Sequence, residues 1–273
     1  MTKRPILRYH GGKWLLAHWI IQNLPQHRVY VEPYGGAASV LMRKERSYAE
    51  VYNELDCEIV NLFAVARDHA EQLAERLRLT PFARAEFQLS YEPSDDPIEQ
   101  ARRTVVRSFM GFGSNSHNKA TGFRSNSNRS GTTPAHDWTN YPDALKGICQ
   151  RLQGVVLENR QAVEVMKAHD TPETLHFVDP PYVLSTRDAG GDYRHEMEDQ
   201  DHRILASEIE QLQGMVVLCG YRCDLYDELF QSWTRIDRNT HADGARQRVE
   251  SLWLNRAAFA AAPQATLALE ATA

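Results

Sequence analysis

The sequence has few cysteines and no long apolar run. Its four cysteines lack the paired spacing of a zinc site, and they are too few for a disulfide scaffold in 273 residues. The eleven histidines show no ligand spacing either, so no metal is predicted. Apolar runs stay short of the roughly 18 to 20 residues of a membrane span, and the first residues lack the apolar region of a signal peptide. We therefore expect a cytoplasmic protein without membrane contact.

A net positive charge is also missing, because 31 basic residues face 36 acidic ones. The rest of the composition, 42% hydrophobic and 25% charged, is that of an ordinary globular protein. The total hides one basic segment: residues 101–153 carry eight basic side chains and two acidic ones, a net charge of +6. Within it, the Gly-, Ser- and Asn-rich stretch from Gly111 to Pro134 is typical of a long polar loop or hairpin.

The basic segment has two interpretations. A solvated, disordered loop fits its composition. Alternatively, it contacts phosphates and reads bases, as basic patches with interleaved aromatics do in nucleic-acid-binding proteins. Its three helical arginines form either a phosphate-binding face or a solvated one. The candidate DNA-contacting residues are Arg8, Arg102, Arg103, Arg107, Lys119, Arg124 and Arg129.

Strands and helices alternate along most of the chain. Short apolar strands are expected at VYVEP, YAEVY, VVLE, TLHFVD, MVVLCG and RVESLWLN. Helices are expected between them, including residues 162–168, 201–212 and 225–233. This order predicts an α/β fold with a mostly parallel sheet and helices on both faces.

A mainly helical segment of roughly ninety residues interrupts this alternation, which is the size of an inserted small domain. Its helices are expected at residues 59–79, 81–91, 97–110 and 143–152. We therefore expect a discontinuous domain of residues 1–63 and 154–256, an insertion of residues 64–153 and a disordered tail of residues 257–273.

The most specific motif is Asp179-Pro180-Pro181-Tyr182, directly after an apolar strand. Ligands of open α/β sheets bind beyond the carboxyl ends of the strands, where this motif falls. The prolines hold the backbone extended and aim its carbonyls. A carboxylate, an aimed carbonyl and an aromatic ring suit a planar base with an amino group, which would donate to Asp179 and the Pro180 carbonyl and stack on Tyr182.

A second motif, VEPYGGAA at residues 31–38, is a strand that breaks into a glycine turn. Glycine lets the backbone approach a ligand closely, although such a turn alone can be purely structural. Glu54 follows at the end of the next strand, about twenty residues later, where an acid can hold ribose hydroxyls. Together these features favour a nucleotide-like ligand.

A third motif, RYHGGK at residues 8–13, is not a phosphate-binding P-loop, because the required first glycine and the Ser or Thr are missing. A glycine pair between an aromatic residue and a lysine instead suits a ligand with one aromatic face and one carboxylate.

In this order, RYHGGK, VEPYGGAAS, NELD and DPPY resemble the motifs of the Dam-type DNA adenine-N6 methyltransferases, from about residue 6 to residue 256. The resemblance implies a Rossmann-like, S-adenosylmethionine-dependent methyltransferase sheet with an inserted, mainly helical target-recognition domain. It also implies a site-specific enzyme of bacterial or phage origin that methylates a flipped adenine in double-stranded DNA. A cognate restriction enzyme would fit such an enzyme, and monomeric action is expected.

The resemblance assigns roles by position. The implied catalytic residues are Asp179, Pro180, Pro181 and Tyr182. The implied cofactor-binding residues are Tyr9, Lys13, Glu32, Pro33, Tyr34, Gly36, Glu54 and Asp179.

The chain departs from the family pattern at three places. The last glycine of the usual Phe-x-Gly-x-Gly is Ala38, which is expected to be tolerated if its φ stays negative. The ribose-holding acid, usually Asp, is Glu54. Gln161 stands where an acid is frequent, so no cofactor contact is assigned to it.

Other functions remain possible on the residues alone. The same motif chemistry serves a cytosine-N4 or an RNA base methyltransferase, although the motif order disfavours both. A catalytically silent DNA-binding relative would not need Asp179 and Tyr182. A nucleotide-dependent oxidoreductase would explain the glycine turn but neither the DPPY motif nor the basic insertion.

Overall fold

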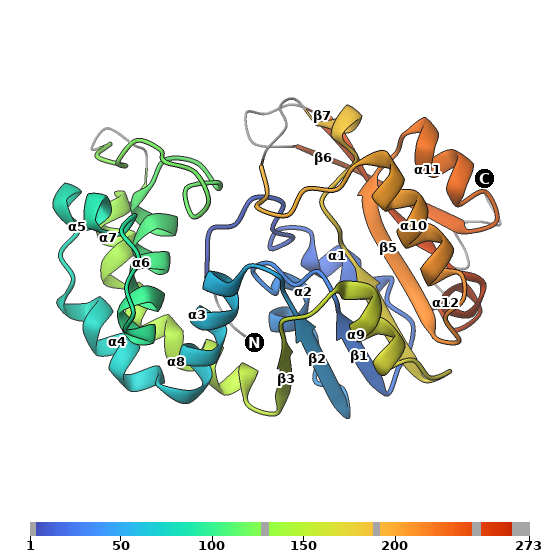
Figure 1. Cartoon of the computed structure of the whole chain (residues 1–273), viewed down its shortest axis with the longest axis horizontal. Helices are drawn as coiled ribbons and strands as arrows, with labels where there is room; N and C mark the ends of the chain where they lie inside the picture. Colours follow the sequence, from blue (N-terminus) through green and yellow to red (C-terminus); the bar gives the residue numbers. More distant parts are fainter. Residues whose placement is uncertain (1–3, 127–130, 188–191, 242–246, 264–273) are drawn as a thin grey trace.

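The computed structural model describes residues 4–126, 131–187, 192–241 and 247–263 (Figure 1). A seven-stranded sheet with the order β3-β2-β1-β4-β5-β7-β6 organises the fold. The strands are β1 (Val29–Glu32), β2 (Ala49–Asn53), β3 (Val155–Glu158), β4 (Thr174–Val178), β5 (Met215–Tyr221), β6 (Thr234–His241) and β7 (Gln247–Leu254). The first five are parallel, whereas β7 runs antiparallel between β5 and β6. This mixed α/β architecture confirms the predicted fold class.

The strand order places a ligand site. From β1 the chain adds β2 and β3 on one side, and it then crosses back to add β4 and β5 on the other. The chain segments that follow β1 and β4 therefore leave the sheet in opposite directions. This leaves a crevice between the carboxyl ends of these two strands. All residues of β4 are buried, as expected for a central parallel strand with both faces covered.

Short helices accompany this sheet. They are α1 (Ala17–Gln22), α2 (Ser39–Arg43), α3 (Cys57–Asp68), α9 (Ala162–Ala168), α10 (Asp199–Ile209), α11 (Asp224–Leu229) and α12 (Arg256–Ala260), with a 3-10 turn at Leu184–Thr186. No helix in the described part of the chain is long and apolar enough to span a membrane.

The remaining helices lie together beside the β3 edge of the sheet, at the left of Figure 1. They are α4 (Ala70–Leu79), α5 (Arg84–Leu89), α6 (Pro97–Met110), α7 (Pro134–Thr139) and α8 (Tyr141–Leu152). The helix α6 begins where the sequence predicts, because Asp96 caps it and Pro97 occupies its first turn. The described residues between α6 and α7 form the expected loop, and Gly111 and Phe123 make a β-bridge within it.

The structure corrects several element boundaries. The single helix expected over residues 59–79 is two helices, since His69 adopts non-helical angles between α3 and α4. The strand β6 and the helix α7 were not predicted. The domain boundary expected at residue 64 falls inside α3, which packs against both α6 and α8.

The tail also differs from the expectation. Residues Arg256–Ala260 form α12 instead of a disordered segment, because the Asn255 side chain caps the helix and Ala258 is buried. The rest of the expected tail, residues 264–273, lies outside the described residues.

Candidate active site

A cavity of about 300 Å³ lies at the carboxyl ends of β1 and β4. Its wall brings together side chains from four separate sequence motifs, as the sequence predicts. The predicted site residues that line it are Tyr9, Lys13, Glu32, Pro33, Tyr34, Gly36, Glu54, Asp179 and Pro181. Gln161, to which the sequence assigned no contact, lines it as well.

The N-terminal motif reaches the cavity as a compact turn. The Gly12 N–H donates to the Tyr9 carbonyl, and Gly11 has a φ of +71°, which favours glycine. A Cβ at Gly11 would lie 2.2 Å from the Tyr193 hydroxyl oxygen, so a larger residue would have to displace the Tyr193 side chain. The turn thereby places the Tyr9 ring and the Lys13 ammonium on the cavity wall.

The glycine turn after β1 also has left-handed backbone. Gly36 has a φ of +48°, and Ala38 has a φ of +51°. Ala38 was expected to be tolerated only with a negative φ, and this condition is not met. A residue other than glycine in the left-handed conformation destabilises the folded state by about 1–2 kcal/mol. The buried Ala38 methyl group, which packs in the main hydrophobic core, offsets part of this cost.

Glu54 faces the glycine turn from the end of β2. Its Oε2 accepts from the Gly36 N–H at 2.8 Å, and its Oε1 accepts from the N–H groups of Leu55 and Asp56. A carboxylate has about four lone-pair positions, so one of them remains for a ligand. Burial raises the pKa of Glu54, and these backbone hydrogen bonds oppose that rise.

Glu32, at the end of β1, makes hydrogen bonds that mainly stabilise the surrounding structure. Its Oε2 accepts from the Tyr30 hydroxyl at 2.8 Å and from the Leu41 N–H at 3.1 Å, which holds α2 against the strand. Burial raises the pKa of Glu32 to about 8, although both hydrogen bonds oppose this. The side chain is therefore protonated near neutral pH.

Asp179 follows β4 directly and forms an ion pair with Lys13. Its Oδ1 lies 3.0 Å from the Lys13 Nζ, which also donates to the Gly11 carbonyl at 2.6 Å. Burial raises the pKa of Asp179 to about 6; Lys13 opposes this rise and Glu250 adds to it. Burial alone would lower the pKa of Lys13, but Asp179 and Glu250 raise it well above its ordinary value.

Tyr182 is not among the residues that line the cavity. Its side chain is buried and its ring does not line the cavity, because the hydroxyl donates to Glu250 and the ring packs edge-on against Tyr221. The Lys13 Nζ lies 4.6 Å from the ring centre. That this ring stacks on a base stays a prediction. Pro180 is buried and does not line the cavity either.

Sequence analysis missed several residues of the site. His117, from the loop after α6, lines the cavity and stacks on Tyr9, with ring centroids 4.4 Å apart. Tyr193 and Arg194 also line it, and Arg194 forms ion pairs with Asp56 and Glu58. These residues lie in loops without a motif, so no local pattern points to them.

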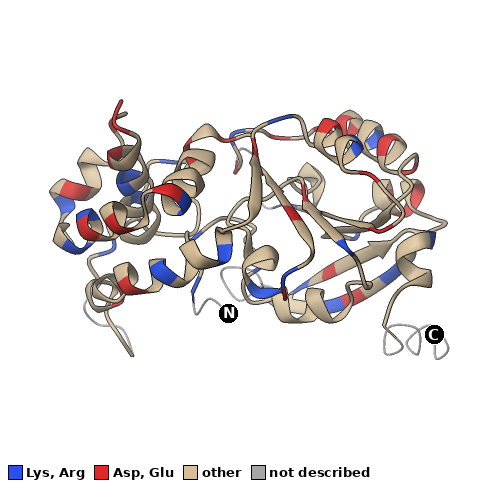
Figure 2. Cartoon of the chain, turned by 90° about the horizontal axis from the view of Figure 1, so that it is seen from below, with Lys and Arg blue, Asp and Glu red and all other residues tan. Residues whose placement is uncertain are grey.

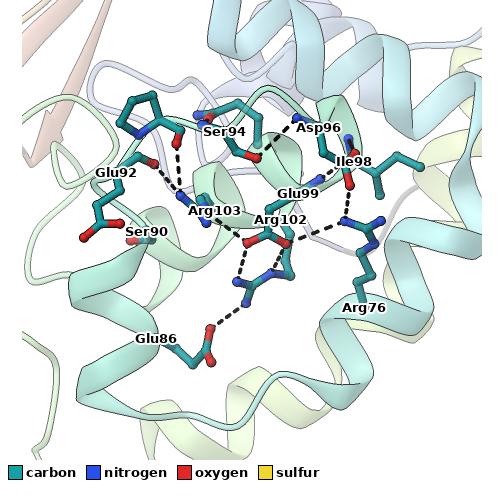
Figure 3. A network of polar contacts seen from close by, with 12 residues as sticks. Arg76, Glu86, Ser90, Glu92, Ser94, Asp96, Ile98, Glu99, Arg102 and Arg103 are labelled. Carbon is teal, nitrogen blue, oxygen red and sulfur yellow. Dashed lines mark hydrogen bonds and ion pairs between the residues drawn. The ribbon is translucent and has the colours of Figure 1, made fainter.

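Carboxylates pair with all three α6 arginines that were predicted to contact DNA, so these side chains are engaged within the protein; Figure 3 shows the pairs of Arg102 and Arg103. Arg102 binds Glu86 and Glu99 at 2.7 Å each, and Arg103 binds Glu99 at 2.8 Å. Arg107 is buried and paired with Glu58. The acidic partners precede residue 101, so the +6 count of residues 101–153 omitted them.

The charge distribution agrees with this pairing. Figure 2 shows acidic and basic residues interspersed along the helices of the α4 to α8 part. Arg151, a fourth basic residue of the counted segment, pairs with Glu50 of β2 at 2.6 Å. These pairs hold the helices together and leave the loop after α6 as the more accessible basic element.

The other predicted DNA contacts lie in or near this loop. The Lys119 side chain is 46% exposed and lies 3.4 Å from Asp192. Arg124 donates to the Phe109 carbonyl, and Arg8 donates to the Gly111 carbonyl, so both guanidinium groups sit at the base of the loop. Arg129 lies outside the described residues.

The arrangement joins an aromatic ring, an ammonium group and carboxylates around one cavity, beside a loop with accessible basic side chains. Within the described ranges, no group of three or more His, Cys, Asp or Glu residues is arranged to hold a metal ion. No curated protein matches the chain. The family model of the D12 class N6 adenine-specific DNA methyltransferases matches residues 9–243, which include every residue found to line the cavity. The chain therefore belongs to the D12 class N6 adenine-specific DNA methyltransferase family.

Proposed function

We propose that the cavity between β1 and β4 is where this adenine-N6 DNA methyltransferase binds S-adenosylmethionine and transfers its methyl group. The observation that carries this proposal is the convergence of four separate motifs on one wall that ends at the Asp179 carboxylate. Convergence of this kind at a topological switch point is typical of ligand sites in open α/β sheets.

The cavity residues fit the chemistry of this cofactor. The Tyr9 ring offers an aromatic face, and Glu54 keeps one lone-pair position for a ribose hydroxyl. Lys13 would hold the cofactor carboxylate as a buried ammonium group, and Gly36 brings backbone close to the ligand without a side chain in between. When bound, S-adenosylmethionine supplies an electrophilic methyl group on a sulfonium.

Asp179 and the Pro180 carbonyl would accept the two hydrogens of the adenine amine. This amine is a poor nucleophile, since its lone pair is delocalised into the ring, and hydrogen bonds that strengthen as its nitrogen becomes pyramidal lower the barrier. Asp179 accepts a hydrogen bond best when it is ionised. Lys13 keeps it ionised at neutral pH despite burial, because the pKa of Asp179 rises only to about 6.

Tyr182 supports this site from behind. In its present orientation the ring lies under the Lys13 ammonium, where a cation–π contact holds the ammonium at the cavity wall. Pro181, which lines the cavity beside Asp179, is the part of the motif that an entering base meets.

For the DNA, we propose a duplex bound by a monomer, with the adenine flipped into the cavity. The loop after α6 would contact phosphates through Lys119 and Arg124, while His117 of the same loop reaches the cavity wall. Flipping a base costs a few kcal/mol, so contacts made by this loop must offset that cost. We place the target-recognition function in residues 64–153 and the methyl transfer in residues 1–63 and 154–256.

Equilibrium binding of S-adenosylhomocysteine tests the cofactor assignment. Glu54→Gln and Lys13→Met should weaken binding at least tenfold, because each removes a charged hydrogen-bonding group from the cavity wall. Glu173→Gln, an exposed change before β4, should bind like the wild type. Wild-type affinity in both cavity variants would exclude this cavity as the cofactor site.

A further inference from the structure

Glu250 is a buried carboxylate behind the proposed active site, beyond the segment that the family model matches. It lies on β7, opposite Tyr221 of β5, and is only 3% exposed. A buried carboxylate is costly unless it is paired, so its partners define what it does.

Three groups contact Glu250 Oε1. The Tyr182 hydroxyl donates to it, the Cys219 thiol donates at 3.3 Å, and the Lys13 Nζ lies 3.9 Å away. Burial raises the pKa of Tyr182 well above its ordinary value, so the phenol stays protonated and remains a donor. Glu250 therefore fixes the ring that lies under Lys13.

Lys13 is shared between two carboxylates. Its Nζ lies 3.0 Å from Asp179 Oδ1 and 3.9 Å from Glu250 Oε1. One ammonium can neutralise only one of these two charges. Each carboxylate thus competes with the other for Lys13, and the Glu250 charge contributes to the raised pKa of Asp179.

We propose that Glu250 is a positioning residue for methyl transfer, which anchors Tyr182 and gives Lys13 a second carboxylate partner. Lys13 lies nearer to Asp179 but occupies only part of that carboxylate, which keeps lone-pair positions for the adenine amine. This inference rests on the roles proposed above for Asp179 and Lys13.

The charges of the groups around Asp179 allow an electrostatic role of Glu250 to be distinguished from a role in packing alone. They come from β1, β5, β7, α11 and three loop positions, and are Lys13, Glu32, Tyr182, Tyr193, Cys219, Tyr226 and Glu250. Burial raises the pKa of the tyrosines and of Cys219, and it raises the pKa of Glu32 to about 8, so these groups are neutral near pH 7. Glu250 is therefore the negative neighbour whose removal should change how Asp179 titrates.

Glu250→Gln tests the proposal, since it removes the charge and keeps the shape. The single-turnover rate of methyl transfer should fall about 10- to 100-fold, the loss expected when a reacting group is misplaced. S-adenosylhomocysteine should still bind within about tenfold of wild type. The acidic midpoint, which is the pH at which the rate falls to half of its plateau value, should also move to lower pH. The reason is that loss of the Glu250 charge lowers the pKa of Asp179.

Glu250→Asp provides the matched comparison. It keeps the charge but shortens the side chain, so its rate should fall while its acidic midpoint stays at the wild-type pH. A wild-type rate in both variants, or equal midpoints in Glu250→Gln and the wild type, would overturn the proposal. If Glu250→Gln does not fold, judged by circular dichroism, a wild-type rate in Glu250→Asp is sufficient to overturn it.

The proposed function is tested independently of the role of Glu250. If Asp179→Asn transfers methyl groups at the wild-type rate, the assignment of the catalytic acid is wrong. If Asp179→Asn is inactive and the Glu250 variants behave as wild type, only the positioning role is wrong.

Discussion

The Lys13 ammonium lies 3.0 Å from the Asp179 carboxylate, and this contact joins the N-terminal glycine turn to the DPPY motif. Both side chains are largely buried, at 7% and 16% exposure, so little solvent screens their attraction. The ion pair therefore sets the protonation state of Asp179 and links the proposed cofactor end of the cavity to the proposed base end.

The pH dependence of transfer should follow Asp179. Its carboxyl has a raised pKa of about 6, so below that pH it is mostly protonated and is a much weaker acceptor for the amine hydrogen. We expect the single-turnover rate to fall about tenfold for each pH unit below this value and to level off above it. Rates measured between pH 4.5 and 8.5, with folding checked by circular dichroism, test this. A rate independent of pH over that range would contradict it.

Lys13→Met should shift this acidic midpoint in the direction opposite to Glu250→Gln. Lys13 lowers the pKa of Asp179 against burial, so its removal raises that pKa and moves the midpoint to higher pH. The same pH series on both variants provides the comparison. Midpoints that move in the same direction would show that the electrostatic description of the site is wrong.

Arg102→Ala should destabilise the fold instead of weakening DNA binding directly. The substitution leaves Glu86 and Glu99 without their shared guanidinium, and hydrogen bonds to charged groups contribute about 1.5–3 kcal/mol. Urea denaturation should show a loss of that size in the free energy of unfolding. Unchanged stability with weakened DNA binding would restore the phosphate-contact interpretation.

Lys119→Ala should have the converse effect. The exposed side chain contributes little to stability, so the free energy of unfolding should stay within about 0.5 kcal/mol of wild type. DNA affinity should fall, and the slope of log affinity against log salt should become shallower by about one. Titrations at several salt concentrations test this, and an unchanged slope would exclude a phosphate contact at Lys119.

Ala38→Gly should leave the free energy of unfolding nearly unchanged, whereas Ala37→Gly should lower it. Relief of the left-handed backbone gains about 1–2 kcal/mol, whereas the lost methyl burial and the more flexible unfolded chain cost a similar amount. Ala37→Gly relieves no strain and should cost about 1 kcal/mol or more. Equal losses in the two variants would mean that the turn at Ala38 carries no strain.

Local patterns were sufficient to predict the parallel strands and the site at their ends. Each predicted strand is short, and every cavity motif except RYHGGK lies at the end of a strand, so sequence neighbours define both. The convergence of Glu54 and Asp179 followed from the α/β order, because carboxyl ends of parallel strands share one edge of the sheet, whereas Tyr9 precedes the first strand.

Contacts between distant segments were not predictable in this way. The partners of the α6 arginines, such as Glu58 and Glu86, lie outside the basic segment and meet it only after the helices pack. Glu250 and His117 likewise reach the site across the fold, and the φ of Ala38 depends on how the glycine turn fits the core. These features require tertiary structure, so charge counts and motifs cannot reveal them.

The central claim is that Asp179 in this cavity directs a methyl group to adenine. Transfer of label from methyl-labelled S-adenosylmethionine to unmethylated duplex DNA, followed by nucleoside digestion and mapping, tests it most directly. We expect label in N6-methyladenine at one short sequence with the wild type, and a loss of at least a hundredfold with Asp179→Asn, which should still bind S-adenosylhomocysteine. Equal labelling by Asp179→Asn, or label that appears in another base, would contradict the account.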